Sequence, residues 1–460
     1  MSARTSEPAH VVRLLRAALG DRVDTSAPSL DQARADKSGH AADGSPLAVV
    51  HAASVDDVQQ TLRIATQTGT PVVTRGAGTG LAGGANAGSG EISLCLRSMD
   101  RVLEVRPDDL LAVVEPGILN GDLNALLAEH GLWWAPDPAS RAISTVGGNI
   151  AAGAGGLLCA KYGVVRDAVL GLDVVLADGR LLHLGHRSVK GVTGYDLTAL
   201  MIGSEGTLGV VVGATLRLRR LVPGEVCTLT AIFPDVRSAA AGSAAVTASG
   251  VQPAIMELMD AASLAAVHDL LGLGAPIAGA AQLTIQTDGP AAADEADTIA
   301  DVLTAAGGTV AKTGDAAEGE RLLQIRRSMH PAMERLGTTL IEDVSVPRSA
   351  LPEMFDEIAR IERAYGLVIP TVAHAGDGNL HPNLIFEGTE VPPVIWEAAG
   401  ELFRAALRLG GTLTGEHGIG VLKRRWLGDE LGEDQWQLQR QIKAVFDPAG
   451  ILNPGKVFGV

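Results

Sequence analysis

After a polar N-terminal stretch, apolar residues follow a regular pattern along the chain. An apolar run over 47–53 predicts a strand, and the apolar residues within 55–65 then recur at the spacing of one helical face. Ser54 is a favourable cap for the start of this helix, and Gly69 ends it. Residues 71–75 predict a second strand. The pattern therefore indicates a β-α-β unit that leads directly into a glycine-rich loop.

The rest of the first half alternates short apolar runs with glycine-containing turns. Residues 122–130 predict a helix that ends at the next glycine. Two apolar runs within 173–184 flank the Asp-Gly pair 178–179, whose residue types suit the positive φ angles of a two-residue hairpin turn. The long strand predicted over 208–221 closes the first domain, and the Pro-Gly pair 223–224 marks its boundary.

The second half starts a new succession of strands and helices. Strands are predicted over 227–233 and 281–289, and helices over 236–249 and 291–306. This order favours an α+β domain with helices on one face of an antiparallel sheet. A last helix is predicted over 429–447, before a short C-terminal segment.

Composition and charge narrow the class of protein. A chain of 460 residues, 46% hydrophobic and 20% charged, is long enough for about two or three folded domains. The net charge of −16 argues against a nucleic-acid partner, which requires a basic surface. Three widely spaced cysteines, Cys95, Cys159 and Cys227, exclude a four-cysteine cluster of common spacing. The N-terminus lacks an apolar signal core, and no apolar run approaches the ~18 residues of a membrane span. A cytoplasmic location is expected, with peripheral membrane association left open.

The loop after residue 75 matches a dinucleotide fingerprint but not its context. Residues 78–83 are spaced G-x-G-x-x-G after a strand, and Asp100 follows about twenty residues on, where an acid could hold a ribose. A Rossmann fold also needs a helix directly after the loop, yet the chain continues through three more glycines to a strand near 92–96. Each helical glycine costs about 1 kcal/mol relative to alanine. The segment instead predicts an anion-binding nest of backbone N–H groups.

Two further glycine-rich segments accompany this loop. They cover residues 134–156 and 194–211, and both offer small residues that let backbone approach a ligand. One such loop alone could be a flexible turn. Three of them in one domain indicate a large ligand with a pyrophosphate and a ring system.

The stretch 368–386 carries the clearest chemistry. A two-residue hairpin turn at 377–378 would place His374 directly opposite His381, with Asn383 on the same face. Two imidazoles at this separation can share a metal ion. Residues 411–420 add an acid and a third histidine, Glu416 and His417, in a turn between glycines. A His/His/Glu set binds zinc, manganese or iron(II) and leaves positions open for a substrate.

The three glycine-rich segments contain, in order, R-G-x-G-T, P-D-P…T-V-G-G-N-I-A and G-S-E-G-T-L-G. This order resembles the p-cresol methylhydroxylase/vanillyl-alcohol oxidase superfamily of FAD enzymes. The resemblance implies an α+β protein with a two-subdomain FAD-binding domain of that type and an α+β substrate (cap) domain with an antiparallel sheet. The cofactor-binding residues that it implies are Arg75, Gly76, Ala77, Gly78, Thr79, Gly83, Gly84, Pro136, Asp137, Thr145, Gly147, Gly148, Asn149, Gly153, Glu205, Gly206, Thr207, Val210 and Asn453. The first loop has no histidine that could tether the flavin, so the FAD is expected to be non-covalent.

Two later motifs, H-x-G-D-G-N-L-H-x-N and G-E-H-G-x-G, resemble the D-2-hydroxyacid dehydrogenases of that superfamily, including the glycolate oxidase large subunit. The resemblance implies three metal ligands, His374, His381 and Glu416, with zinc as the expected metal. It further implies His417 as the general base and both Asn383 and Arg326 as substrate-binding residues. The D-2-hydroxyglutarate enzymes have a lysine where Ile341 stands, so the expectation of a dicarboxylate substrate is weakened but not excluded.

The sequence thus predicts an FAD-dependent enzyme that oxidises a small D-2-hydroxy acid of the glycolate, D-lactate or D-2-hydroxyglutarate class. A metal and a base would deprotonate the hydroxyl as hydride passes to flavin N5. The electron acceptor should be other than NAD, and a homodimer stays open. The alternatives are an oxidase that uses oxygen, a zinc hydrolase and a silent flavin-binding subunit. The expected domains are 1–222 for FAD, with 1–46 as an extension, 223–425 for substrate, and a segment 426–460 that returns to the FAD domain.

Overall fold

The computed structural model describes residues 7–459, which form two compact units. Among these residues, unit 1 combines 7–155, Gly163–Leu221 and 416–459, and unit 2 combines Gly156–Tyr162 and Val222–Gly415. This division differs in two respects from the expected one. Unit 2 ends at Gly415 rather than at 425. It also includes the short segment Gly156–Tyr162, which follows the second glycine-rich segment.

Unit 1 begins with a small sheet of order β1-β2-β4-β3. Its strands are β1 (Val23–Asp24), β2 (Ala48–His51), β3 (Val72–Arg75) and β4 (Ile92–Cys95), and α3 (Val55–Thr68) connects β2 to β3. Three of the strands are parallel, and β1 is antiparallel to β2. The Ser54 hydroxyl accepts the Asp57 N–H and Gly69 is left-handed, so both predicted helix ends are confirmed. Residues 76–91 contain no helix, which confirms that the Rossmann arrangement is absent.

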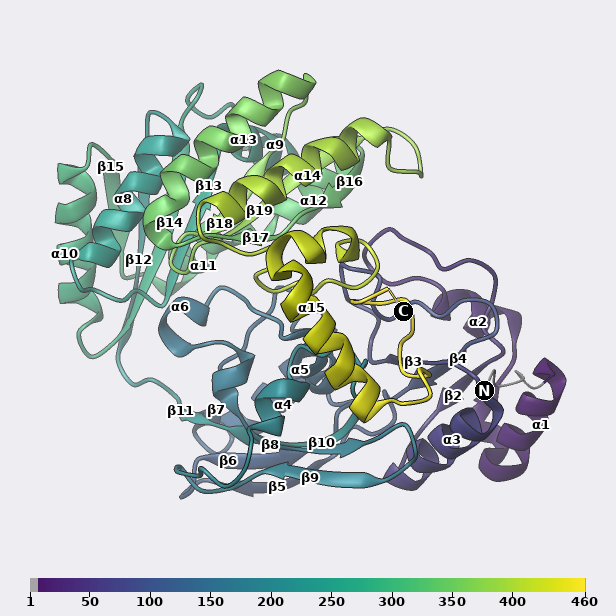
Figure 1. Ribbon diagram of the computed structural model, residues 1–460. Helices are drawn as coiled ribbons and strands as arrows, with labels where there is room; N and C mark the ends of the chain where they lie inside the picture. The colour runs from purple at the N-terminus through teal and green to yellow at the C-terminus, as the bar shows by residue number, and fades with distance from the viewer. Residues whose placement is uncertain (1–6, 460) are drawn as a thin grey trace. The chain divides into compact units, whose positions relative to one another are not determined.

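The second sheet of unit 1 is antiparallel, with the order β5-β6-β10-β8-β9 (Figure 1). Its strands are β5 (Val102–Arg106), β6 (Leu111–Val114), β8 (Val169–Val175), β9 (Leu181–Gly185) and β10 (Val210–Arg217). The short strands β7 (Leu132–Trp133) and β11 (Arg219–Arg220) pair beside it. The helices of this unit are α1 (Pro8–Leu19), α2 (Ala27–Ala33), α4 (Asn120–Ala128), α5 (Val146–Ala152), α7 (Leu197–Met201) and α15 (Leu427–Phe446).

The turn between β8 and β9 corrects the predicted hairpin. The Leu176 N–H donates to Arg180 O, so three residues, not two, form the loop. Of the two turn residues only Gly179 has a positive φ, of 82°. The prediction of two positive φ angles was therefore wrong, although the Asp-Gly pair lies in the turn.

Unit 2 is built on one antiparallel sheet of order β15-β12-β14-β13-β18-β19-β16, with β17 also paired to β19. Its strands are β12 (Glu225–Phe233), β13 (Ile255–Met259), β14 (Ala281–Gly289), β15 (Thr309–Thr313), β16 (Thr338–Ile341), β17 (Val344–Ser345), β18 (Thr371–His374) and β19 (Asn379–Phe386). Its helices are α6 (Cys159–Tyr162), α8 (Val236–Ala248), α9 (Ala261–Leu271), α10 (Ala292–Ala305), α11 (Ala316–Arg327), α12 (Met329–Leu336), α13 (Leu351–Tyr365) and α14 (Pro393–Arg408).

Helices cover both faces of this sheet, so the prediction of helices on one face was wrong. Gly242 of α8 packs against Phe233 of β12, whereas Gly319 of α11 packs against Thr228 of the same strand. Residues of odd and even number point to opposite faces of a strand. Helices α8, α13 and α14 lie side by side in one layer (Figure 1), and α9, α11 and α12 contact one another in the other. Thr228 is buried beneath α11 on the second face of the sheet.

A buried cluster on the second face contains Met259, Ile325, Met333 and Val372. It joins the central strands to α11 and α12, and the candidate chemistry lies on this same face. Among the residues that the structure describes, no helix combines the length and apolarity needed to cross a membrane.

Candidate active site

The first glycine loop of unit 1 packs closely onto the start of α5. A Cβ atom added at Gly76 would overlap the Thr145 hydroxyl, and one added at Gly78 would overlap the Arg75 guanidinium. Thr145 caps α5 by accepting the Gly148 N–H at 3.2 Å. Gly147, the second residue of α5, leaves no room for a side chain beside Pro116. The first two predicted loops therefore come together, and glycine is required at their contacts.

Arg75 holds the first loop in shape. Its guanidinium donates to Ala35 O at 2.8 Å and to Ala85 O at 3.2 Å. Burial lowers the pKa of Arg75 below its ordinary value, and nearby Asp36 opposes that shift. The side chain thus connects the start of the loop that was expected to hold a pyrophosphate to Ala85 within it and to Ala35, which follows α2.

The polar atoms around α5 fit a bound cofactor. Asn149 is 4% exposed, and its Nδ2 has no hydrogen-bond partner among the described residues. The same is true of the buried Ser144 hydroxyl. A buried donor left without an acceptor costs about 1–3 kcal/mol, so both atoms call for a ligand with acceptor groups. A flavin offers such acceptors, and the residues present are compatible with FAD.

The third predicted loop lies against α5. The Gly203 N–H donates to Ile150 O at 3.0 Å, and the Glu205 N–H donates to Ala151 O at 2.8 Å. Gly153 ends α5 with a φ of 70°, beside Gly203. The Thr207 hydroxyl donates to Ser204 O within the loop. All three glycine-rich segments therefore meet in unit 1.

Glu205 and Asn453 tie these loops to the C-terminal segment. The Glu205 carboxylate accepts the N–H groups of Ile419 at 2.7 Å and Gly420 at 2.8 Å. Burial raises the pKa of Glu205 to about 7. Asn453 donates to Gly84 O at 3.1 Å and to Glu205 O at 2.5 Å. The Glu205 side chain, which the resemblance implies to be cofactor-binding, thus holds the turn that follows His417.

The remaining cofactor candidates lie in the same three loops. Pro136 O accepts an N–H of Asn120 at 2.9 Å, and Asp137 lies 3.7 Å from Arg141. Gly83 and Gly206 adopt positive φ angles, and Val210 is the first residue of β10.

The histidine hairpin of unit 2 differs in register from the predicted one. His374 pairs with Asn379, and His381 pairs with Val372, so four residues connect β18 to β19 instead of two. The Gly378 N–H donates to His374 O at 3.0 Å across this connection. The prediction that the two histidines are directly opposed was therefore wrong. They still share a face, because the register differs by two residues.

The two imidazoles lie next to each other. Their ring centroids are 5.0 Å apart with an interplanar angle of 84°, and one ring nitrogen of each lies within 4.8 Å of the other. Both residues are less than 10% exposed. Two nitrogen donors at this separation fit a shared divalent cation.

Glu257 of β13 contacts both a histidine and the candidate arginine, and sequence reasoning did not find it. Its Oε1 lies 2.7 Å from His374 Nδ1, and its Oε2 lies 2.7 Å from Arg326 Nε. Burial raises the pKa of Glu257, but His374 and Arg326 together outweigh burial and leave it below its ordinary value. The sequence signal that could have indicated a buried functional acid was a single glutamate within the apolar strand 255–259. The structure shows that this glutamate is 1% exposed.

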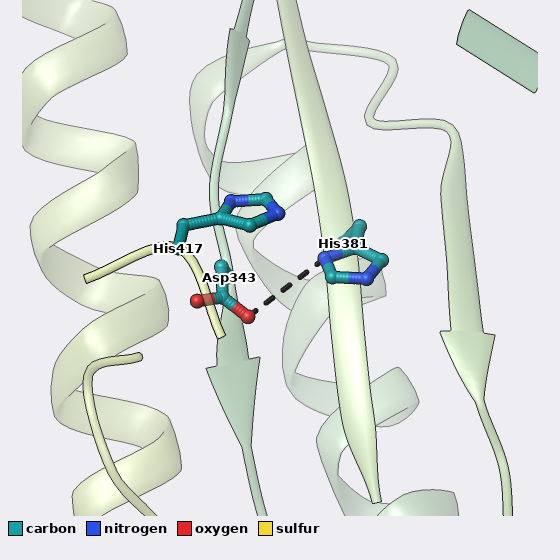
Figure 2. Close-up of side chains that lie close together, drawn as sticks. All are labelled: Asp343, His381 and His417. Carbon is teal, nitrogen blue, oxygen red and sulfur yellow. Dashed lines mark ion pairs between the residues drawn. The ribbon is translucent and has the colours of Figure 1, made fainter. Parts of the chain in front are cut away.

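Asp343 lies near the second histidine, at a longer distance than Glu257 lies from the first. Figure 2 shows its carboxylate directed at the His381 ring, with Oδ1 3.8 Å from Nδ1. Asn379 donates to the same carboxylate at 2.6 Å, and the Thr414 hydroxyl donates at 2.5 Å. Asp343 is fully buried and was also missed. Each histidine therefore has a carboxylate near its Nδ1.

Asn383 follows His381 on the same face of β19. Its Nδ2 donates to His381 O at 2.8 Å and to Pro370 O at 3.1 Å. Both amide protons are therefore bonded to backbone, so the group that Asn383 could offer a substrate is its Oδ1 acceptor.

Glu416 and His417 belong to unit 1. The His417 Nε2 lies 3.7 Å from Glu416 Oε1, and both side chains are mostly buried. The Glu416 carboxylate lies over Gly155, where an added Cβ would be 2.5 Å from Oε2. The preceding residue, Gly415, is the last residue of unit 2 and packs on Asn379 of the same unit.

The fold and these loops are those of a flavoprotein, and the comparisons identify its family. Residues 46–185 match the FAD binding domain family, and residues 222–457 match the family of FAD linked oxidases, C-terminal domain. The chain belongs to this FAD-linked oxidase family and is an FAD-dependent oxidoreductase, as predicted.

Among its relatives is the glycolate oxidase subunit GlcD of Bacillus subtilis, 38% identical over 425 residues that cover 90% of this chain and 89% of the relative. GlcD of Escherichia coli is 36% identical over 89% of this chain and 83% of its own length. A D-lactate dehydrogenase of Archaeoglobus fulgidus is 35% identical over 89% and 90%.

Solved structures share the fold at low sequence identity. p-Cresol methylhydroxylase with bound substrate has a TM-score of 0.80 at 19% identity, covering 98% of this chain and 96% of that one. 4-Ethylphenol oxidase from Gulosibacter chungangensis has a TM-score of 0.77 at 19% identity, covering 98% and 97%. The predicted fold of the p-cresol methylhydroxylase type is confirmed.

Proposed function

We propose that this protein oxidises a small D-2-hydroxy acid to the 2-oxo acid with FAD as the immediate electron acceptor. The observation that carries the proposal is the buried pair His374 and His381, each with a carboxylate near its Nδ1. The similarity to proteins named glycolate oxidase and D-lactate dehydrogenase supports the same substrate class.

His374, His381 and Glu416 would hold a divalent metal, which we expect to be zinc. Neutral imidazole and carboxylate groups form a common zinc donor set, and three protein ligands leave a position for substrate. When bound, the metal would lower the pKa of the substrate hydroxyl, and the flavin would accept the hydride.

The other residues bind the acid and accept its proton. Arg326 would bind the substrate carboxylate through the two Nη groups of its guanidinium. Asn383 would accept a hydrogen bond through Oδ1. His417 would take the hydroxyl proton as general base. Its Nε2 lies 3.7 Å from Oε1 of Glu416, so the base would lie beside a proposed metal ligand.

A short monocarboxylate suits the site better than a dicarboxylate. Ile341 of β16 is the direct cross-strand partner of Asn383, so the two side chains point to the same face. An apolar side chain at this place offers no charge to a second carboxylate. We therefore favour glycolate or D-lactate over D-2-hydroxyglutarate.

The decisive experiment is anaerobic bleaching of the flavin by glycolate, D-lactate, L-lactate, D-malate and D-2-hydroxyglutarate. We expect bleaching by a D- or achiral acid, loss of bleaching after chelator treatment, and recovery when zinc is added back. An oxidised flavin with every acid would refute the proposal. Bleaching that chelator does not change would remove the metal from it.

The base assignment has its own test. His417→Ala should keep its flavin but reduce it about 10²–10⁴-fold more slowly, the usual contribution of a general base. His183→Ala is the matched control, since its imidazole is 74% exposed in the same unit. Normal flavin reduction by His417→Ala would show that another group takes the proton.

The electron acceptor beyond flavin should be other than NAD, because the glycine loop lacks the helix of a nicotinamide site. An oxidase would instead produce hydrogen peroxide in proportion to the acid consumed. Flavin absorbance near 450 nm in the purified protein would distinguish a dehydrogenase or an oxidase from a zinc hydrolase, which has no flavin.

A further inference from the structure

Glu257 is the one acid within the five residues of β13, and it uses both carboxylate oxygens. One oxygen lies 2.7 Å from His374 of β18 and the other lies 2.7 Å from Arg326 of α11. The arginine contact is an ion pair rather than a linear hydrogen bond. Two sheet strands and one helix therefore meet at a single carboxylate that is 1% exposed.

The contact to His374 selects one form of the ring. A neutral imidazole that donates from Nδ1 to a carboxylate carries its lone pair on Nε2. The carboxylate also restricts rotation of the ring about its χ2 angle. Glu257 therefore presents Nε2 of His374 as the metal-binding atom in a defined direction.

The contact to Arg326 fixes the guanidinium by its Nε edge. The Nη edge is then the side that can meet a carboxylate with two parallel hydrogen bonds. Arg326 is 11% exposed, so its charge requires a nearby anion. Glu257 supplies that anion whether or not a substrate is bound.

We propose that Glu257 is a positioning residue that sets the spacing between the metal-binding His374 and the carboxylate-binding Arg326. This inference rests on the proposed function. A 2-hydroxy acid carries its hydroxyl and carboxylate on adjacent carbon atoms, so the groups that bind them must keep a short, fixed separation. One carboxylate that is hydrogen-bonded to His374 and ion-paired with Arg326 provides that separation.

The test compares Glu257→Ala and Glu257→Gln in the FAD-loaded protein. Zinc affinity is measured by competition with a chelator of known affinity, and kcat and KM are measured for the hydroxy acid that bleaches the flavin. Loss of a ligand-orienting carboxylate lowers metal affinity by about 10–100-fold, which we expect for Glu257→Ala. KM should rise in the same variant.

Glutamine separates the two roles. Its amide oxygen can still accept the His374 N–H, whereas its NH₂ group would face Arg326 and repel it. Glu257→Gln should therefore bind zinc within about three-fold of wild type and still show a raised KM. The d–d absorption spectrum of the cobalt(II)-substituted protein should remain close to wild type in this variant and change in Glu257→Ala.

Glu115→Ala is the matched control. Glu115 is 5% exposed and forms an ion pair of the same length, 2.7 Å, with Arg101 in unit 1, although Arg101 is 69% exposed. If this control loses zinc affinity and raises KM as Glu257→Ala does, the effect is general destabilisation and the inference is wrong. If Glu257→Ala does not fold, the KM of Glu257→Gln tests the inference. A raised KM supports the positioning role, and an unchanged KM overturns it.

The failure of this inference differs from the failure of the proposed function. Wild-type protein that binds zinc and is bleached by a hydroxy acid, with both Glu257 variants within two-fold of it in zinc affinity and KM, overturns only the positioning role. Wild-type protein that binds no zinc and is not bleached overturns the function itself.

Discussion

Gly155 offers a direct test of Glu416 as a metal ligand. A Cβ added at Gly155 would lie 2.5 Å from Glu416 Oε2 and 3.0 Å from Glu416 Cβ. Gly155 is not among the residues with positive φ, so alanine can adopt its backbone conformation. The substitution Gly155→Ala therefore acts on the neighbouring glutamate rather than on the local backbone.

The displacement can be worked out from these distances. Carbon atoms in optimal contact lie about 3.5–4.0 Å apart, so Glu416 Cβ has to move by about 0.5 Å or more. Zinc–carboxylate bonds are about 2.0–2.2 Å long, and a site tolerates deviations of about 0.2 Å. The shift exceeds that tolerance more than twofold. We expect a loss of zinc affinity on the order of 10–100-fold, as for other disturbed ligands.

The assay is chelator competition for zinc in the FAD-loaded variant, with flavin absorbance as the check on folding. Flavin reduction by the hydroxy acid should slow together with zinc affinity and recover at high zinc concentration. Gly428→Ala is the control, because an added Cβ there meets no atom within 4 Å. Zinc affinity within two-fold of wild type in Gly155→Ala would show that Glu416 does not bind the metal.

Three further predictions concern stability. Lys443→Met should destabilise unit 1 by about 3–5 kcal/mol, because it leaves the buried Asp447 carboxylate without its cation. The measurement is the temperature at which the flavin is released, which should fall. An unchanged release temperature would contradict this prediction. Thr145→Ala should cost about 1 kcal/mol through the lost cap of α5, and Thr145→Ser should restore the melting temperature. Burial raises the pKa of Asp260 to about 6, above the ordinary value of 3.8. The stability that this group contributes is therefore present below about pH 4 and lost as pH rises through about 6. In urea unfolding, the free energy of unfolding of wild type should fall by up to about 3 kcal/mol relative to Asp260→Asn between about pH 4 and 7. A difference between the two proteins that does not change with pH would refute this prediction.

Local signals were sufficient for the elements around the cofactor loops. The helix after β2 begins at Ser54 and ends at Gly69 as predicted, because a cap and a left-handed glycine act within a few residues of the chain. The run of glycines after Arg75 likewise prevents a helix without help from the rest of the fold. Such features depend on nearest neighbours, and a single sequence contains them.

The histidine hairpin shows where local rules stop. The Asp-Gly pair at 377–378 favours a two-residue turn, but Gly378 packs onto Val346 O and Gly376 packs onto Ala160. These contacts come from distant segments and set a four-residue connection. The error moved the pairing by two positions, and an even shift preserves the face of every side chain. The prediction of a shared histidine face was therefore right although the predicted register was wrong.

Glu257 and Asp343 could not be predicted because their partners are far away in sequence. Glu257 lies 117 residues before His374, and Asp343 lies 36 residues before Asn379. A lone acid in an apolar strand indicates a buried partner but does not say which one. The arrangement of β13, β18 and β19 in one sheet supplies that information.

Glu205 links two motifs that the sequence keeps about two hundred residues apart. Its backbone N–H bonds α5 at Ala151 O, and its carboxylate holds the N–H groups of Ile419 and Gly420. The cofactor loop and the turn that follows His417 are therefore one connected structure within unit 1. A base that must take a proton as hydride leaves the substrate needs a fixed place relative to the flavin. If His417 is the base, as proposed, the hydrogen bonds from the turn that follows it to Glu205 would provide that fixed place.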